Sequence, residues 1–82
     1  MKARISVLLK QEVLDPQGKA IQRASGSLGY DAIRSVRQGK LFEVSLDASD
    51  EGRARSQLAE LCEKLLANPV IEDYEIVRFE AP

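Results

Sequence analysis

The chain has 82 residues, of which 12 are Lys or Arg and 13 are Asp or Glu, and it contains one Cys and no His. The balanced charge provides no overall field that would attract nucleic acid or an anionic membrane, and the composition offers neither a disulfide framework nor a recognisable set of metal ligands. We expect a single soluble domain over residues 1–82, in the reducing cytoplasm, with no nucleic acid, membrane or cofactor bound by the chain itself.

A chain of this length buries only about 60–65% of the surface that its unfolded form exposes, so its core must be thin. A second copy would bury apolar area that the monomer leaves in water. We therefore expect a homo-oligomer.

The first half of the chain predicts a strand followed by a well-delimited helix. Apolar and polar residues alternate over residues 5–10, as in a half-buried strand. Asp15 can then cap a helix that starts at Pro16 and ends near Leu28, because Gly29 can adopt the left-handed conformation of a helix terminus. Gly26 weakens this helix, and we interpret it as a tolerated poor helix former.

The middle of the chain predicts an antiparallel hairpin. Residues 33–37 form a weak strand with only Ile33 and Val36 as apolar anchors. Residues 38–40 supply a turn that contains a glycine, and Phe42, Val44 and Leu46 alternate with polar residues in a clear strand.

The last third predicts a helix and a final strand. Ser49 or Asp50 can cap a helix whose apolar stripe runs over four turns to Leu66, and Asn68-Pro69 ends it. Residues 70–79 then alternate as a strand. Within the helix, we interpret Cys62 as a small buried hydrophobe and not as a nucleophile.

The expected order is therefore βαββαβ, in the α+β class. Such a chain closes as a ferredoxin-like two-layer sandwich, with an antiparallel sheet and both helices on one face. The other face stays open, carries some of Leu8, Leu41, Val77 and Phe79, and favours a partner. No catalytic constellation is evident, so the local chemistry indicates a small interaction domain.

Four motifs, taken in their order along the chain, resemble the PurS family, the small subunit of phosphoribosylformylglycinamidine synthase. The motifs are residues 13–18 (VLDPQG), 28–30 (LGY), 36–40 (VRQGK) and 62–74 (CEKLLANPVIEDY).

The resemblance implies a non-catalytic accessory subunit of a ligase in de novo purine biosynthesis. It implies a homodimer or homotetramer that joins a PurL-type, ATP-dependent synthetase to a PurQ-type glutaminase and supports ammonia transfer between them. ATP and Mg are expected in the partner synthetase. The complex converts formylglycinamide ribonucleotide, ATP and glutamine to formylglycinamidine ribonucleotide, ADP, phosphate and glutamate.

Seven residues are our candidates for contacts between subunits or for the support of such contacts. Each also has a purely structural interpretation, such as helix cap, helix start, hairpin edge or turn glycine. They are Asp15, Pro16, Arg37, Gly39, Lys40, Glu72 and Tyr74.

Two other classes of function share the expected fold. An ACT-like regulatory domain would bind a small molecule at a dimer interface beside a loop with a glycine, as residues 15–18 could provide. An acylphosphatase-like enzyme is the weaker alternative, because no phosphate loop with an arginine is evident.

Overall fold

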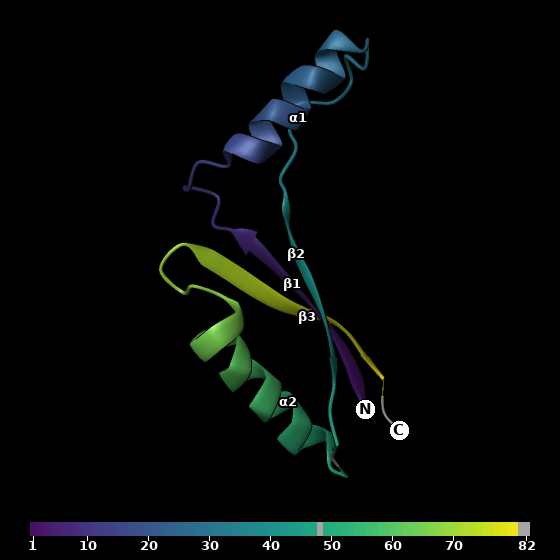
Figure 1. Cartoon of the computed structure of the whole chain (residues 1–82), viewed down its shortest axis with the longest axis vertical. Coiled ribbons are helices and arrows are strands. Elements are labelled where there is room, and N and C mark those ends of the chain that lie inside the picture. The colour runs from purple at the N-terminus through teal and green to yellow at the C-terminus, as the bar shows by residue number, and fades with distance from the viewer. Residues whose placement is uncertain (48, 81–82) are drawn as a thin grey trace.

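The computed structural model describes residues 1–47 and 49–80. Two helices, a π-helical turn and three strands follow one another along the chain (Figure 1). They are β1 (Lys2–Leu9), α1 (Pro16–Ser27), β2 (Gly39–Ser45), α2 (Glu51–Leu61), the turn η1 (Cys62–Leu66) and β3 (Glu72–Glu80).

The strands form one antiparallel sheet in the order β2-β1-β3. Ile5 in the central strand lies opposite Phe42 on one side and Ile76 on the other. The α+β class and the antiparallel sheet are confirmed, with β1 placed between the strands that follow α1 and α2.

The predicted strand over residues 33–37 is wrong: no strand forms there, and the expected hairpin is absent from the described residues. The segment instead runs back beside α1, with a hydrogen bond from Ile33 N to Tyr30 O at 3.2 Å. Only two of its five side chains are apolar, which is too few for it to cover the edge of a sheet. β2 therefore pairs with β1 alone on this side.

The helices also differ from the expected arrangement, because only α2 covers a face of the sheet. α1 projects beyond the end of the sheet (Figure 1), and of its residues only Gly18 is buried. The sequence pattern supplies α1 with apolar side chains but does not require that its own sheet cover them. We call the part of α1 after Gly18, together with the returning segment, the arm (residues 19–35).

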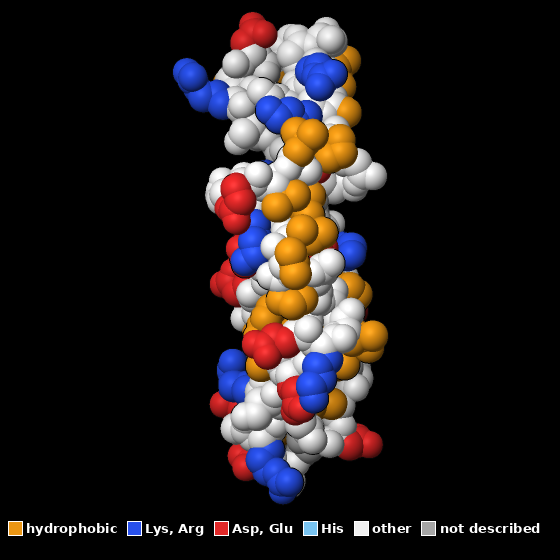
Figure 2. Space-filling model, turned by 90° about the vertical axis from the view of Figure 1, so that its left-hand side faces the viewer, with side chains coloured by type: hydrophobic (Ala, Val, Ile, Leu, Met, Phe, Trp, Pro, Cys, Tyr) orange, Lys and Arg blue, Asp and Glu red, His pale blue; other side chains and the backbone are white. Residues whose placement is uncertain are grey.

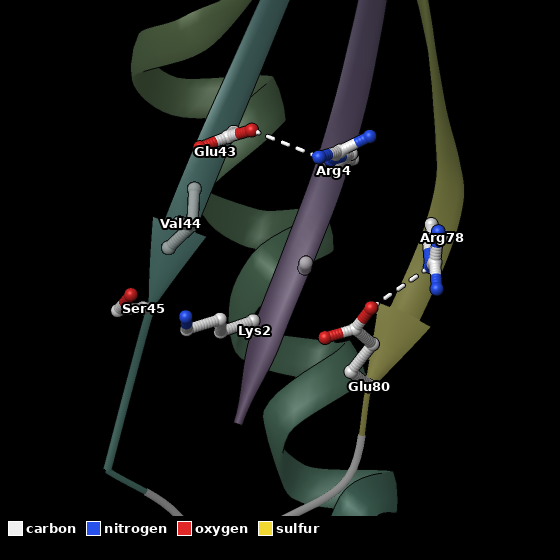
Figure 3. A pocket seen from close by; sticks show the side chains of 8 residues that line it. Lys2, Arg4, Glu43, Val44, Ser45, Arg78 and Glu80 are labelled. Atoms are coloured by element: carbon white, nitrogen blue, oxygen red, sulfur yellow. Dashed lines mark ion pairs between the residues drawn. The ribbon is translucent and has the colours of Figure 1, made fainter.

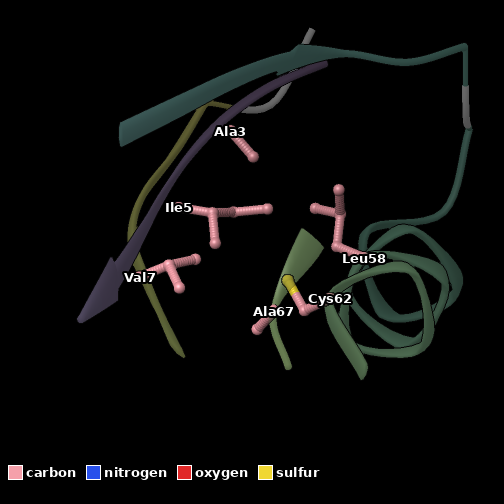
Figure 4. Close-up of a cluster of buried hydrophobic side chains, with 6 residues drawn as sticks. All are labelled: Ala3, Ile5, Val7, Leu58, Cys62 and Ala67. Atoms are coloured by element: carbon pink, nitrogen blue, oxygen red, sulfur yellow. The ribbon is translucent and has the colours of Figure 1, made fainter. Parts of the chain in front are cut away.

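The core lies between the sheet and α2. Ala3, Ile5 and Val7 point from β1 toward the buried side chains of the helical segment (Figure 4), and each is no more than 1% exposed. Leu58 and Cys62 occupy the opposing layer at 2% and 0% exposure, so the interpretation of Cys62 as a buried hydrophobe is confirmed.

A β-bulge determines which face Phe79 occupies. The pairing of β1 with β3 shifts between Arg4 and Ile5, which leaves Val77 as an extra residue. After the bulge, Phe79 lies opposite Ala3 and packs against the core. Phe79 therefore belongs to the covered face and not to the open one, where strict alternation from Val77 had placed it.

The whole chain is thin and long, with extents of 50 × 27 × 14 Å and a radius of gyration of 16.0 Å. A compact domain of this length has a radius of gyration of about 12 Å. The accessible surface is 6154 Å², whereas a folded monomer of this mass exposes about 4,900 Å². The arm accounts for this shape, because it leaves the body of the protein.

Candidate functional site

The candidate site lies where the arm leaves the sheet. The chain passes from β1 into α1 and returns from the arm into β2 at this point. We call these two segments, residues 13–18 and 36–40, the neck. The neck contains five of the seven candidate residues, and Glu72 lies beside it.

Asp15 is the central residue of the neck. Its Oδ1 accepts a hydrogen bond from Gly18 N at 2.9 Å, which caps α1 as predicted. Its Oδ2 accepts a second bond from Gln38 N at 2.8 Å, across 23 residues of sequence. These two N–H groups, that of Gly18 foremost, hold the pKa of the Asp15 carboxyl below its ordinary value of 3.8.

Two further side-chain contacts connect the same segments. The Arg37 guanidinium donates a hydrogen bond to Leu9 O at the end of β1. The Gln38 amide donates to Oε1 of Gln17 in the first turn of α1. Strand end, helix start and returning chain are thus joined to one another.

Lys40 and Glu72 close the side of a shallow cleft next to the neck. Lys40 lies opposite Val7, and Glu72 lies opposite Leu9, so both project on the covered face of the sheet. Lys40 Nζ is 3.6 Å from Glu72 Oε2, and the two side chains are 62% and 13% exposed. Glu72 Oε1 accepts a bond from Asn68 N at 2.7 Å, which orients the carboxylate.

Tyr74 projects on the same covered face, opposite Val7, but packs against the core and does not line the cleft beside the neck. Its hydroxyl lies 3.4 Å from Glu63 Oε1, and partial burial together with Glu63 raises the pKa of the phenol. The nearby Asp73 carboxylate lies 2.9 Å from Lys10 Nζ and raises the pKa of that ammonium group. Tyr74 is therefore separate from the neck.

The open face of the sheet holds a second hollow, lined by charged side chains (Figure 3). Arg4 and Glu43 approach to 3.2 Å and Arg78 and Glu80 to 2.9 Å. Exposed pairs of this kind contribute about 0–1 kcal/mol and can adapt to a partner. This face is consequently more polar than the alternation of apolar residues predicts, although Leu41 remains 59% exposed on it.

The structure brings Asp15, Pro16, Gly39, Lys40 and Glu72 around one cleft, together with Val7, Leu9, Gln17 and Gln38. Arg37 adjoins this cleft, and Tyr74 does not. Sequence reasoning placed Gln38 in a turn and in the motif over residues 36–40 but not among the candidate contacts, and it missed that the Gln38 backbone N–H binds Asp15. Nothing in its local pattern marks it, because the bond depends on how the arm returns. The role of the seven residues in subunit contacts stays a prediction.

The side chains of the neck can form hydrogen bonds and ion pairs, either within the chain or with a partner. The polar groups of the neck are amides, one Lys–carboxylate pair and a capped carboxylate. Among residues 1–47 and 49–80, no group of three or more His, Cys, Asp or Glu side chains could hold a metal ion. No helix within the same residues has the length and apolar character needed to cross a membrane.

The sequence also matches a known family. A profile described as PurS, phosphoribosylformylglycinamidine (FGAM) synthase, matches residues 2–80. The chain belongs to the PurS family. A relative from Mycobacterium leprae, called phosphoribosylformylglycinamidine synthase subunit PurS, is 49% identical over 77 residues, which cover 94% of each chain.

Solved structures of PurS proteins have the same fold as this chain. PurS of Methanocaldococcus jannaschii, described as one of the subunits of formylglycinamide ribonucleotide amidotransferase in the purine biosynthetic pathway, is 40% identical. It aligns with a TM-score of 0.83 over 96% of this chain and 98% of its own. A chain in the structure of PurLQS from Thermotoga maritima is 27% identical and also aligns with a TM-score of 0.83, over 96% and 99%.

Proposed function

We propose that this chain is the non-catalytic assembly subunit of a phosphoribosylformylglycinamidine synthase. In this role it joins a PurL-type synthetase to a PurQ-type glutaminase and supports ammonia transfer between them. Membership of the PurS family carries the proposal, and the similar chain in PurLQS supports it. The same evidence favours this role over an ACT-like sensing domain.

The chemistry explains why such a subunit is useful. Ammonia released into water is diluted and protonated, and the ammonium ion is not a nucleophile. A chain that holds the two enzymes together raises the effective concentration of one at the other. Under this proposal, ATP and Mg bind to the synthetase, and the complex works in the cytoplasm.

We also propose that a second copy of this chain covers the arm. The accessible surface of 6154 Å² exceeds that of a compact monomer by about 1,200 Å². A stable interface buries about 800 Å² on each partner. The surplus surface is therefore large enough for one interface between copies.

Hydrophobic side chains on the arm support this placement. Ile21 and Ile33 are 43% and 45% exposed, and Leu28 and Tyr30 are 75% and 63% exposed. Figure 2 shows hydrophobic side chains running in a nearly continuous stripe from the arm along the body of the protein. Patches of this kind mark surfaces that bind other proteins.

Reconstitution tests the assembly role. We expect the PurL-type and PurQ-type chains to require this chain for activity with glutamine. The synthetase supplied directly with ammonium serves as the control, because that reaction needs no transfer from the glutaminase and should proceed without this chain. Glutamine-dependent activity that stays the same when this chain is omitted would contradict the proposal.

Two matched substitutions test the arm. Ile21→Ser removes an apolar side chain from α1, whereas Leu41→Ser makes a similar change on the open face of the sheet. We expect Ile21→Ser to shift the protein toward monomer in light scattering at micromolar concentration, with Leu41→Ser unchanged. The opposite pattern would place the interface on the open sheet face, and a monomeric wild-type chain would exclude both interfaces.

A further inference from the structure

Among the described residues, the arm is connected to the rest of the molecule through the neck alone. β1 ends at Leu9 and α1 begins at Pro16, and the chain re-enters the sheet at Gly39. The direction of the arm is therefore set at one place, by the contacts between the outgoing and the returning segment.

We propose that the Asp15 carboxylate is the positioning group that fixes the direction of the arm relative to the sheet. One oxygen binds the start of α1 through Gly18 N, at 2.9 Å. The other binds the returning chain through Gln38 N, one residue before β2, at 2.8 Å. One rigid group thus binds both the start of the helix and the residue before β2, and neither bond alone would link the two.

The packing around Gly18 leaves the neck little freedom. The position that a Cβ would occupy on Gly18 lies in contact with Val36 O of the returning chain and 2.6 Å from Asp15 Oδ2. The two backbones are therefore closer here than any side chain would permit. Arg37, which donates to Leu9 O, adds a third point of attachment at the end of β1.

Asp50 provides an internal comparison. It also caps a helix: its Oδ1 accepts from Gly52 N, two residues further on, at 3.0 Å, whereas Asp15 accepts from the N–H three residues further on. Its carboxylate has no bond to a distant segment among the described residues. Capping alone therefore does not require the second contact that Asp15 makes.

The length of the arm makes this angle important. α1 has 12 residues, which corresponds to about 18 Å of helix, so a tilt of about 10° at the neck would move its far end by about 3 Å. A displacement of this size would separate side chains that pack closely across an interface. This inference rests on the proposed assembly role only in that the arm is the surface that meets a second copy.

Asp15→Asn separates the two bonds of the carboxylate. Asparagine has one side-chain oxygen, so it can accept from Gly18 N or from Gln38 N but not from both. Because asparagine is as good an N-cap as aspartate, we expect this oxygen to keep the cap on Gly18 N and the bond from Gln38 N to be lost. Asp50→Asn is the matched control, since it makes the same chemical change at the cap of α2. Far-ultraviolet circular dichroism verifies that both variants keep their helices.

Distances between spin labels provide the readout. Ser27 and Ser45 are exposed at the end of α1 and at the end of β2, and Cys62 is buried. Labels on cysteines introduced at positions 27 and 45, in chains diluted with unlabelled protein, report the distance from arm to sheet within one chain. Hydrogen exchange of the Gln38 amide reports the bond itself.

We expect one narrow distance peak for the wild type and for Asp50→Asn. For Asp15→Asn we expect a distance distribution that is broader than that peak or shifted from it. We also expect hydrogen exchange of the Gln38 amide to be faster by about tenfold. A narrow, unshifted peak in Asp15→Asn would overturn the proposal. These measurements need no partner enzyme. The positioning role of Asp15 and the assembly role of the chain can therefore be confirmed or refuted independently of each other.

In the reconstituted synthase, a positioning role predicts that the substitution changes the affinity of this chain for its partners and not the maximal rate. Asp15→Asn should raise the concentration of this chain needed for half-maximal activity with glutamine and leave the maximal rate near that of the wild type. Asp50→Asn should change neither quantity. An equal effect of the two variants would mean that Asp15 acts only as a helix cap.

Discussion

Two glycines of α1 provide a direct test of the neck, because the same substitution should have opposite effects at them. Gly18 is buried against the returning chain, whereas nothing lies within 4 Å of the position that a Cβ would occupy on Gly26. Both residues lie in the helix, so Ala gains similar helix propensity at each. Any difference between Gly18→Ala and Gly26→Ala therefore reports tertiary contact.

The magnitudes follow from this geometry. In a helix interior Ala is more favourable than Gly by about 0.8–1 kcal/mol. Gly26 is the last residue but one of α1, so Gly26→Ala should gain a part of this amount. At Gly18 the new methyl group meets Val36 O, a backbone atom that cannot turn away, and it lies 3.0 Å from Asp15 Cγ. Overpacking costs about 1–3 kcal/mol, and we expect the upper part of that range. The net effect of Gly18→Ala is then a loss of about 2 kcal/mol.

Urea denaturation followed by circular dichroism measures both free energies of unfolding. Protein concentration must be the same for every variant, because association shifts the apparent stability. Gly26→Ala should unfold at a higher urea concentration than the wild type, and Gly18→Ala at a lower one. Equal stability of the two variants would show that Val36 O of the returning chain does not lie in contact with a side chain placed at position 18.

Three further outcomes follow from the core and from the perturbed pKa values. Leu58→Ala should lower the free energy of unfolding by about 2–5 kcal/mol in the same urea assay, because Leu58 is only 2% exposed; a smaller loss would mean that the helix does not seal the core. Since the pKa of Asp15 lies below 3.8 in the folded chain, its stabilisation is complete above that pH and is lost as the pH falls through the folded value. The Gln38 amide resonance should accordingly be constant at neutral pH and move only in acid, and a transition above pH 3.8 would contradict this. Burial raises the pKa of the Cys62 thiol above 9.0, so thiol reagents should react with it only in denaturant, and rapid reaction of the native protein would refute its burial.

Local signals predicted the helix termini well. Asp15 caps α1, Pro16 is its first residue, and Gly29 adopts a positive φ of 93° just after it. Asp50 caps α2, as expected. Each of these features depends on residues a few positions apart, which a single sequence displays directly. The interpretation of Gly26 as a tolerated poor helix former is also consistent with its open surroundings.

Non-local arrangements were not predictable in this way. The apolar residues of α1 predict that one face of the helix is buried. The pattern is the same whether this face packs against the chain's own sheet or against another molecule. The bond from Gln38 to Asp15 exists only once the arm has folded back. The bulge at Val77 shifts one face of β3 without any local glycine or proline to mark it.

The absence of a strand over residues 33–37 leaves β2 as an outer strand, with β3 on the opposite side of the sheet. Unpaired backbone groups along such edge strands can pair with strands of other molecules, and charged side chains oppose this pairing. β3 carries acidic residues at Glu72, Asp73, Glu75 and Glu80. Protonation of these groups in acid would leave Arg78 as the one charged side chain of β3, so we expect the protection of this edge against strand addition to weaken at low pH.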